Sequence, residues 1–245
     1  MNVPAPMSTL SEDRPIVIVG AGLAGCLFAT MLRRRGLPVA VFERRPDLRS
    51  ADIAAGRSIN LALSTRGLDA LERAGLADAV MAEAIPMAGR RMHGADGTLT
   101  FQAYGQSGQA IHSVSRRGLN VLLMNAAEAA GAEFAFGHRC VGVDLESGEV
   151  TFKTDEGRRK VAAQLVVGAD GIFSAVRGRL QRTDRFDFEQ EFLRSGYKEL
   201  TIPANADGSH RLSDTHALHI WPRHEFMLIA LPNADGSFTC TLFAT

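Results

Sequence analysis

The chain has 245 residues, enough for one large domain or one and a half. Its 27 basic side chains equal its 27 acidic ones, so no net field attracts nucleic acid or an anionic membrane. No apolar run reaches the length of a membrane-spanning helix, so we expect no membrane segment in this portion. The three cysteines form no C-x-x-C pair, which indicates a reducing, cytoplasmic location without a disulfide framework.

The first elements of the chain follow a polar arm, residues 1–13, which lacks the apolar stretch of a signal peptide. Ile16–Val19 is a run of four β-branched residues, which predicts a strand buried on both faces. A helix from Leu23 to about Arg35 follows a turn with G-x-G-x-x-G spacing. Such a turn brings backbone and helix amides to a pyrophosphate. We therefore expect a dinucleotide to bind at Gly20, Gly22, Leu23 and Gly25.

The second strand, Pro38–Glu43, ends in an acid eighteen residues after Gly25. At this distance a carboxylate can accept hydrogen bonds from a ribose 2′-hydroxyl. The same carboxylate would repel a 2′-phosphate, so Glu43 favours FAD or NAD over NADP. A glycine-rich turn without a ligand is the alternative. Strand, glycines, helix, second strand and acid nevertheless occur in the order that the motif requires.

The middle of the chain alternates helices and short strands after an arginine-rich loop, residues 44–57. Ser64 or Thr65 is the expected N-cap of the next helix. Helices are predicted at 65–74, 77–84 and 115–130, and Pro86 ends the second of them. Strands are predicted within 87–101 around a turn at 94–97, and at 111–114, 134–136 and 140–145, with a hairpin at 150–161.

The last third of the chain begins with a second predicted buried strand, Leu165–Gly168, which runs into a turn at Asp170-Gly171. A helix from Ile172 to Leu180 follows it. A charged, phenylalanine-rich stretch then extends to Arg194. Beyond it, four β-type segments predict a mostly antiparallel sheet distinct from the nucleotide-binding part: 197–202, 216–221, 226–231 and 237–243.

The segment Leu165–Arg177 resembles the Asp-Gly motif of the FAD-dependent aromatic hydroxylases, in which the aspartate contacts the flavin nucleotide. Capping of a helix by Asp170 is compatible with the same residues. Five further blocks are similar to the branch of that family that hydroxylates L-kynurenine: residues 56–63, 197–203, 219–223, 229–233 and 237–243. The resemblance extends over nearly the whole chain from Ile16 onward.

The resemblance implies an α/β fold. A Rossmann-like FAD-binding domain, 14–86 and 107–183, would carry an inserted, mostly antiparallel β-sheet substrate domain, 87–106 and 184–245. The chain stops inside a strand pattern at Leu242–Thr245, so we expect it to be truncated at the C-terminus. The remaining part would hold the family's second flavin motif and its C-terminal helices.

The resemblance also implies FAD contacts at the helix start and around the acid of the second strand, namely Ala24, Phe42, Glu43, Arg44 and Arg45. Further contacts are implied in later segments, at Ala62, Arg116, Cys140 and Asp170. An arginine near a pyrophosphate would form charge-assisted hydrogen bonds, which suits Arg116. A solvated arginine at a helix start is the alternative for that residue.

The implied reaction is the hydroxylation of L-kynurenine to 3-hydroxykynurenine in tryptophan degradation. NADPH would act as a transient co-substrate and O₂ as the oxidant, through a flavin hydroperoxide. The flavin carries this chemistry, so no side chain is assigned as a catalytic acid or base. Arg90 and Tyr104 would bind the substrate carboxylate. Arg91 leaves the register open by one residue, since neighbouring strand residues face opposite ways, and we favour Arg90.

An apolar set in the last strands alternates as core residues do, and the resemblance implies that its face lines the substrate site: Met227, Ile229, Leu231 and Phe238. Four nearby histidines could suggest a metal, but no acid or cysteine completes a ligand set: His210, His216, His219 and His224. Two other functions stay open, a hydroxylase of another aromatic acid and a flavin- or partner-binding fragment without turnover. An NAD dehydrogenase is disfavoured by the Asp-Gly motif and by residues 57–62.

Overall fold

The computed structural model describes residues 14–50, 60–106 and 108–245. The predicted polar arm, part of the arginine-rich loop and the start of the block at 56–63 lie outside these ranges. The chain packs as two units. Unit one comprises Met1–Ala54 and Asn120–Glu189, and unit two comprises Ala55–Leu119 and Gln190–Thr245. The boundaries of these packing units differ from those of the predicted domains, which stay a prediction.

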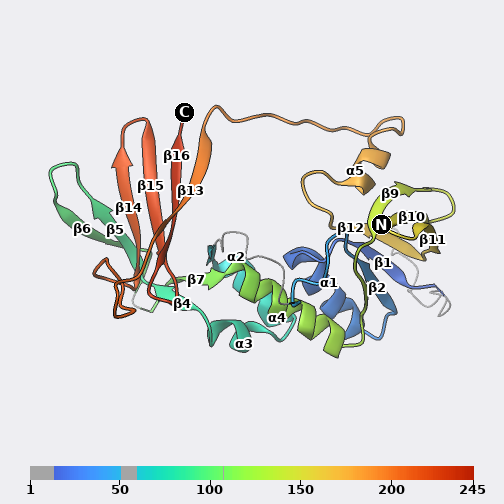
Figure 1. Ribbon diagram of the computed structural model, residues 1–245, viewed down its shortest axis with the longest axis horizontal. Coiled ribbons are helices and arrows are strands. Elements are labelled where there is room, and N and C mark those ends of the chain that lie inside the picture. Colours follow the sequence, from blue (N-terminus) through green and yellow to red (C-terminus); the bar gives the residue numbers. More distant parts are fainter. Residues whose placement is uncertain (1–13, 51–59, 107) are drawn as a thin grey trace, which may run out of the picture. The chain divides into compact units, whose positions relative to one another are not determined.

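Unit one contains a four-stranded parallel sheet in the order β12-β1-β2-β8, of which Figure 1 labels β12, β1 and β2. Its strands are β1 (Ile16–Val19), β2 (Val39–Phe42), β8 (Glu133–Ala135) and β12 (Leu165–Gly168). Every residue of β1 and β2 is buried, as predicted for the first strand. The prediction of a second buried strand is wrong for β12, where Leu165 is 51% exposed. β12 is an edge strand, so it has a neighbour on one side only.

The parallel sheet of unit one is covered on both faces. On one face lies an antiparallel sheet of β9 (Arg139–Val143), β10 (Glu149–Thr154) and β11 (Gly157–Ala162), which confirms the predicted hairpin. Its Val150 and Phe152 share one core with Val17 of β1 and Phe42 of β2. Helix α1 (Leu23–Arg33) packs on β1 and β2, and Gly36 after it has a φ of 78°. Strand alternation assigns α1 to the opposite face of the sheet.

Helix α5 spans Ala175–Leu180 and begins three residues later than the predicted start at Ile172. Gly171 adopts a φ of 78°, which turns the chain out of the helical region just before the helix. Ser174 is the N-cap, and its Oγ accepts a hydrogen bond from the Arg177 amide. The local capping geometry therefore fixes where this helix starts.

Unit two contains a six-stranded sheet in the order β13-β16-β15-β14-β5-β6 (Figure 1). Its strands are β5 (Gly89–His93), β6 (Leu99–Ala103), β13 (Gly196–Ile202), β14 (Ala217–Arg223), β15 (Phe226–Pro232) and β16 (Phe238–Ala244). Only the β14–β5 pair among them is parallel, which confirms a mostly antiparallel sheet. Phe238 and Cys240 form a core on one face with Ala230.

The rest of unit two is a small antiparallel sheet with two short helices. The sheet has the order β3-β7-β4 and comprises β3 (Asn60–Leu63), β7 (Ile111–Ser115) and β4 (Ile85–Met87). The helices are α2 (Thr65–Arg73) and α3 (Ala77–Met81), and the long helix α4 (Arg116–Ala129) starts in unit two and ends in unit one. Among the described residues, no helix is both long and apolar enough to cross a membrane.

Candidate functional site

The turn between β1 and α1 has the backbone geometry that its glycine spacing predicts. Gly20 has a φ of 106°, and a Cβ there would lie 2.5 Å from the Ala169 carbonyl oxygen. A Cβ on Gly25 would lie 2.1 Å from the Gly20 carbonyl oxygen. A Cβ on Gly22 would meet no atom within 4 Å. The packing of the chain itself therefore requires two of the glycines, whereas the third leaves open space at the start of α1.

The carboxylate of Glu43 is buried and holds this turn. Its Oε2 accepts a hydrogen bond of 2.9 Å from the Ala21 amide. Its Oε1 accepts bonds from the Arg45 amide, at 3.0 Å, and from Arg45 Nε, at 2.9 Å. Burial favours a raised pKa, but the hydrogen bonds and the charge of Arg45 outweigh it, so the pKa of Glu43 is lowered. Glu43 is thus held as an anion at the turn, and its bond to a ribose stays a prediction.

A second turn, at Asp170, follows the neighbouring strand β12. The Ala169 amide donates a hydrogen bond of 2.8 Å to the Val19 carbonyl, which joins the two turns. Asp170 Oδ1 accepts from the Ser174 hydroxyl at 2.6 Å, and Oδ2 accepts from the Ala175 amide at 2.6 Å. Asp170 therefore stabilises the start of α5, the capping role that its sequence context allows. Its contact with a flavin stays a prediction.

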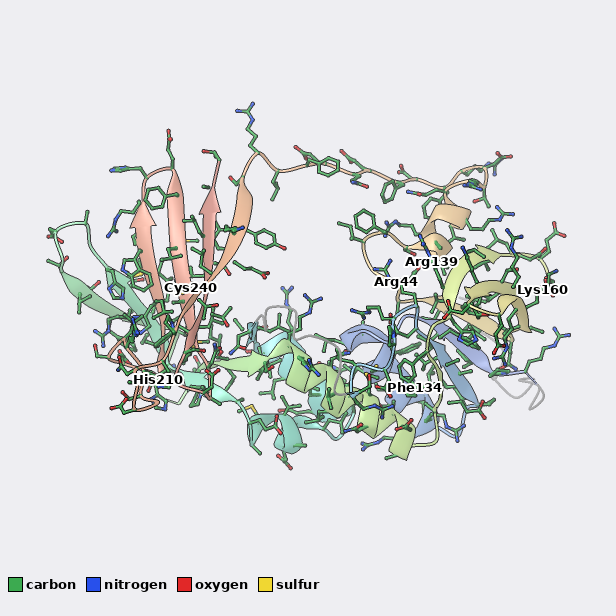
Figure 2. The ribbon with its side chains drawn as sticks, in the orientation of Figure 1. Arg44, Phe134, Arg139, Lys160, His210 and Cys240 are labelled. Atoms are coloured by element: carbon green, nitrogen blue, oxygen red, sulfur yellow. The ribbon has the colours of Figure 1, made fainter. Side chains whose placement is uncertain are left out.

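The other predicted cofactor residues of unit one divide into exposed and buried groups. Ala24 at the start of α1 is exposed, as are Arg45 and Arg44, which is labelled in Figure 2. Phe42 is buried and stacks on Phe152 with ring centroids 4.2 Å apart, so its side chain belongs to the core. The Phe42 carbonyl instead accepts a hydrogen bond of 2.8 Å from the Gly20 amide. Leu23 is half-buried and Cys140 is buried.

Two predicted cofactor residues belong to unit two rather than to the unit that contains the glycine turn. Ala62 is exposed on β3, where it pairs with Ser113 of β7. Arg116 is exposed and is the first residue of α4. The positions of both residues are compatible with a ligand contact from solvent, and their binding to FAD stays a prediction.

The predicted substrate pair lies together on one edge of the six-stranded sheet. Arg90 is exposed on β5, and its Cζ lies 5.0 Å from the ring centroid of Tyr104, just beyond β6. The Tyr104 amide donates a hydrogen bond of 3.1 Å to the Ala88 carbonyl. Burial raises the pKa of Tyr104, against the effect of the Arg90 guanidinium, so the phenol stays protonated at neutral pH. A guanidinium and a phenolic hydroxyl are both donors suited to a carboxylate.

Arg91 faces the opposite side of the same strand and is bound within the chain. Its Nε and Nη2 both donate to Asp214 Oδ2, the first at 3.0 Å. Its Cζ also lies 5.2 Å from the ring centroid of Phe101. Among the residues that the structure describes, Arg90 has no carboxylate within 4.0 Å. Arg90 and Arg91 therefore differ in both face and partner.

The apolar set predicted for one face divides between two. Ile229 pairs with Ile220, which pairs with Met92, two residues along β5 from Arg90. Met227, Ile229 and Leu231 therefore share the face of Arg90. Phe238 pairs with Pro232 and lies on the other face, fully buried in the core with Ala230 and Cys240. The prediction that all four share one face is wrong for Phe238, because the hairpin register puts it out of phase with Leu231.

The four histidines near the C-terminus, His210, His216, His219 and His224, do not gather around one point. His216 and His224 are exposed, and His210, labelled in Figure 2, lies in the loop between β13 and β14. Buried His219 instead contacts His93, whose Nε2 lies 2.8 Å from His219 Nδ1. In the described ranges, no group of three or more histidine, cysteine, aspartate or glutamate residues could hold a metal ion.

Two residues that the sequence did not indicate hold residues next to the predicted contacts. Asp214 binds Arg91, and Asn120 Nδ2 donates a hydrogen bond of 3.2 Å to the Ala21 carbonyl of the glycine turn. Neither residue carries a local signal. Asp214 lies 123 positions from Arg91, and Asn120 lies 99 positions from Ala21, within an otherwise ordinary helix.

The parallel sheet, the glycine turn without side-chain capping of α1 and the buried acid define a dinucleotide-binding protein. A family model described as "FAD binding domain" matches residues 13–233. The chain therefore belongs to this FAD-binding family.

Curated relatives similar to the chain carry the name kynurenine 3-monooxygenase. The one from Christiangramia forsetii is 48% identical over 238 residues, which cover 96% of this chain and 52% of the relative. The one from Myxococcus xanthus is 49% identical over 241 residues, covering 97% and 52%. The one from Dictyostelium discoideum is 46% identical over 233 residues, covering 94% and 50%. The chain thus spans about half the length of the curated relatives it matches.

Two solved structures are also similar to this chain. The tetrameric form of 2-methyl-3-hydroxypyridine-5-carboxylic acid oxygenase matches with a TM-score of 0.74 at 23% identity, over 96% of this chain and 59% of that one. PqsL of P. aeruginosa in complex with 2-aminobenzoylacetate matches with a TM-score of 0.70 at 22% identity, over 94% and 60%. These likenesses support the fold of the chain.

Proposed function

We propose that this chain is part of a flavoprotein aromatic monooxygenase that hydroxylates L-kynurenine to 3-hydroxykynurenine, with FAD as cofactor, NADPH as reductant and O₂ as oxidant. The family match supports FAD. The shared name of relatives at 46%, 48% and 49% identity supports the substrate. Within the structure, the proposal depends most on one observation, the pairing of exposed Arg90 with Tyr104 on the sheet.

The glycine turn fits the diphosphate of FAD. The absent Cβ of Gly22 leaves open space, and α1 begins there without a side-chain cap, so its first amides can meet an anion. Exposed Ala24 leaves the same helix end accessible. When bound, FAD supplies the redox chemistry that no side chain can perform. The chain's own part is to hold the diphosphate at this turn and the adenosine ribose at Glu43.

The face of Arg90 fits the carboxylate and ring of an aromatic amino acid. An exposed guanidinium can hold a planar carboxylate with two parallel hydrogen bonds, and the Tyr104 hydroxyl can add a third. Arg91 already binds Asp214, which supports Arg90 as the ligand. Met227 and Ile229 share the face of Arg90 and are accessible, so they offer apolar contact to the ring, whereas Leu231 on the same face is buried. In this proposal Phe238 supports the sheet from its other side.

The test is a kynurenine titration of NADPH oxidation by the full-length protein, with coupled detection of hydrogen peroxide. Arg90→Lys keeps the charge but loses the two parallel N–H donors of the planar guanidinium, which costs about 1.5–3 kcal/mol of carboxylate binding. We expect KM to rise roughly tenfold or more, and a misplaced ring to raise the peroxide formed per NADPH. Tyr104→Phe removes one hydrogen bond and should have a smaller effect.

Arg91→Lys is the matched control for this test, since it makes the same change one residue away on the opposite face. A defect in Arg91→Lys with normal Arg90→Lys would show that Arg91, rather than Arg90, binds the substrate carboxylate. FAD-loaded protein whose NADPH oxidation does not respond to kynurenine would overturn the proposed substrate. Protein without FAD would overturn the proposed function as a whole.

A further inference from the structure

The backbone of Ala21, between the first two glycines of the turn, is held by side chains from three separate segments. Its amide donates to Glu43 Oε2 at 2.9 Å. Its carbonyl accepts from Asn120 Nδ2 at 3.2 Å and from the Cys26 thiol at 3.3 Å. Ala21, Cys26, Glu43 and Asn120 are all buried. Of these side chains, only Asn120 comes from beyond the nucleotide-binding strand–helix–strand segment.

The two ends of the Asn120 amide have different surroundings. A carbonyl can only accept, so the nitrogen of the amide faces Ala21, and this nitrogen also lies 3.7 Å from Met124 Sδ. Among the described residues, the buried Oδ1 has no hydrogen-bond partner. A buried acceptor without a partner costs free energy, which a leucine at this position would avoid. Stability alone therefore does not account for an asparagine here.

Backbone geometry links Asn120 to the open side of the turn. The Ala21 carbonyl and the Gly22 amide belong to one planar trans peptide, in which they point in opposite directions. Asn120 holds the carbonyl from the protein interior, so the Gly22 N–H points away from Asn120. The neighbouring Cα is also open, since a Cβ on Gly22 would meet no atom within 4 Å. Gly22, which follows this peptide, restricts its orientation little, so the orientation depends on these outside contacts.

We propose that Asn120 is a positioning residue for the cofactor: it orients the Ala21–Gly22 peptide so that the Gly22 amide donates to the diphosphate of FAD. The inference rests on the proposed FAD binding. The other two polar side chains on Ala21 keep constant charges near neutral pH. Glu43 has a lowered pKa and stays an anion, and burial raises the pKa of the Cys26 thiol to about 12, so it stays a neutral donor.

The test compares Asn120→Asp, Asn120→Leu and the control Asn125→Asp in the full-length protein. Asn125 lies on the exposed side of the same helix, where its Oδ1 accepts from Arg49 and a carboxylate can do the same. FAD dissociation constants are measured by flavin fluorescence at pH 8 and pH 5.5, beside the melting temperature of each apoprotein. At pH 8 an aspartate offers only acceptors to the Ala21 carbonyl, so we expect FAD binding to weaken roughly tenfold or more.

Protonation distinguishes positioning from simple packing. A buried carboxyl group that faces a carbonyl, without the donors that hold Glu43 as an anion, has a raised pKa. At pH 5.5 the carboxyl introduced in Asn120→Asp can therefore donate its O–H to Ala21 and recover much of the FAD affinity. Asn120→Leu should bind FAD weakly at both pH values with an apoprotein melting temperature no lower than that of the wild type. Asn125→Asp should follow the wild type within about twofold.

The outcomes separate this inference from the proposed function. Wild-type protein that binds no FAD would overturn both. Wild-type protein that binds FAD, with Asn120→Asp binding equally at both pH values, would overturn the role of Asn120 and leave the proposed function intact. The role of Asn120 would also be overturned, with the proposed function intact, if both Asn120 variants lost FAD only in proportion to lost apoprotein stability, without recovery at pH 5.5.

Discussion

The glycine turn of unit one and the proposed substrate face of unit two, which is the face of the six-stranded sheet that carries Arg90, are held in contrasting ways. At the turn, buried side chains fix the backbone through several hydrogen bonds, as Glu43 and Asn120 do at Ala21. On the sheet, exposed Arg90 contacts the ring of Tyr104. Arg91, on the opposite face, forms an ion pair with Asp214. The turn is therefore organised before any ligand binds, whereas the ligand itself can order the side chains of the substrate face.

This difference predicts where mutations act. A change at the turn disturbs groups that the fold needs, so it should affect stability and cofactor affinity together. A change of Arg90 removes an exposed guanidinium that has no ion pair among the described residues, so it should affect substrate affinity more than stability. The following substitutions test this contrast.

The largest effect is expected for Gly25→Ala. The new Cβ would lie 2.1 Å from the Gly20 carbonyl oxygen, so β1 and α1 would have to separate. We expect a loss of folding free energy on the order of 3 kcal/mol, together with loss of FAD. Urea unfolding and the flavin content of the purified protein measure the two effects.

Gly22→Ala is the matched control, because its Cβ would meet no atom of the chain within 4 Å and its φ of −77° suits alanine. Stability should change by about 1 kcal/mol or less while FAD affinity falls, since the methyl group would occupy the space proposed for the diphosphate. Full FAD affinity in Gly22→Ala would contradict that placement of the ligand.

Glu43→Gln should have the next largest effect. An amide replaces one acceptor with a donor, which would face an N–H of Ala21 or Arg45, so we expect a loss of about 2 kcal/mol at pH 7. The lowered pKa of Glu43 gives stability that is present above its ordinary pKa of 4.5 and is lost as the pH falls below that value. The difference between the urea midpoints of the wild type and of Glu43→Gln should therefore be smaller at pH 4 than at pH 7. A constant difference between them would contradict the lowered pKa.

Asp214→Asn should have a smaller effect, on the sheet alone. It breaks the ion pair with Arg91, whose two side chains are 27% and 24% exposed, so solvent screens the interaction. We expect a loss of about 1 kcal/mol in unfolding free energy and an unchanged KM for kynurenine. A marked rise in KM would indicate that the face of Arg91, rather than that of Arg90, binds the substrate.

Local patterns were sufficient to predict the turn and most strands. The β-branched run Ile16–Val19 and the glycines after it determine their own conformations through nearest neighbours. The burial of β12 was mispredicted because an edge position depends on the order of the whole sheet. The face of Phe238 was missed because a hairpin register can shift alternation by one residue.

The parts of the site that the sequence did not predict depend on distant contacts. The parallel pairing of β14 with β5 brings Asp214 to Arg91, 123 positions away, and no local pattern specifies it. Asn120 is one polar residue in an amphipathic helix, and only the folded chain places its amide on Ala21. The resemblance to a family supplied Arg90 and Tyr104, and the structure adds the partner of Arg91.

The same face as Arg91 carries two histidines in contact, buried His219 and half-buried His93, and their partners determine their tautomers. His219 Nε2 lies 3.0 Å from the Asp214 carbonyl, which can only accept, so this nitrogen carries the proton. His219 Nδ1 therefore accepts from His93 Nε2, 2.8 Å away. Burial lowers the pKa of His219, against the opposing effects of the Asp214 carbonyl and carboxylate. Burial and the charges of His219 and two arginines lower the pKa of His93.

The smallest predicted effect is the response of this pair to acid. A histidine whose pKa is lowered by folding contributes stability above its unfolded pKa of about 6.5, and this stability is lost as the pH falls. From pH 7.5 to pH 6.0 we expect His219 to account for a loss of less than about 1 kcal/mol. His219→Gln keeps a donor for Asp214 and an acceptor for His93, so its urea midpoint should depend less on pH. His216→Gln, an exposed control, should keep the wild-type dependence, and equal slopes in all three proteins would contradict the role of burial.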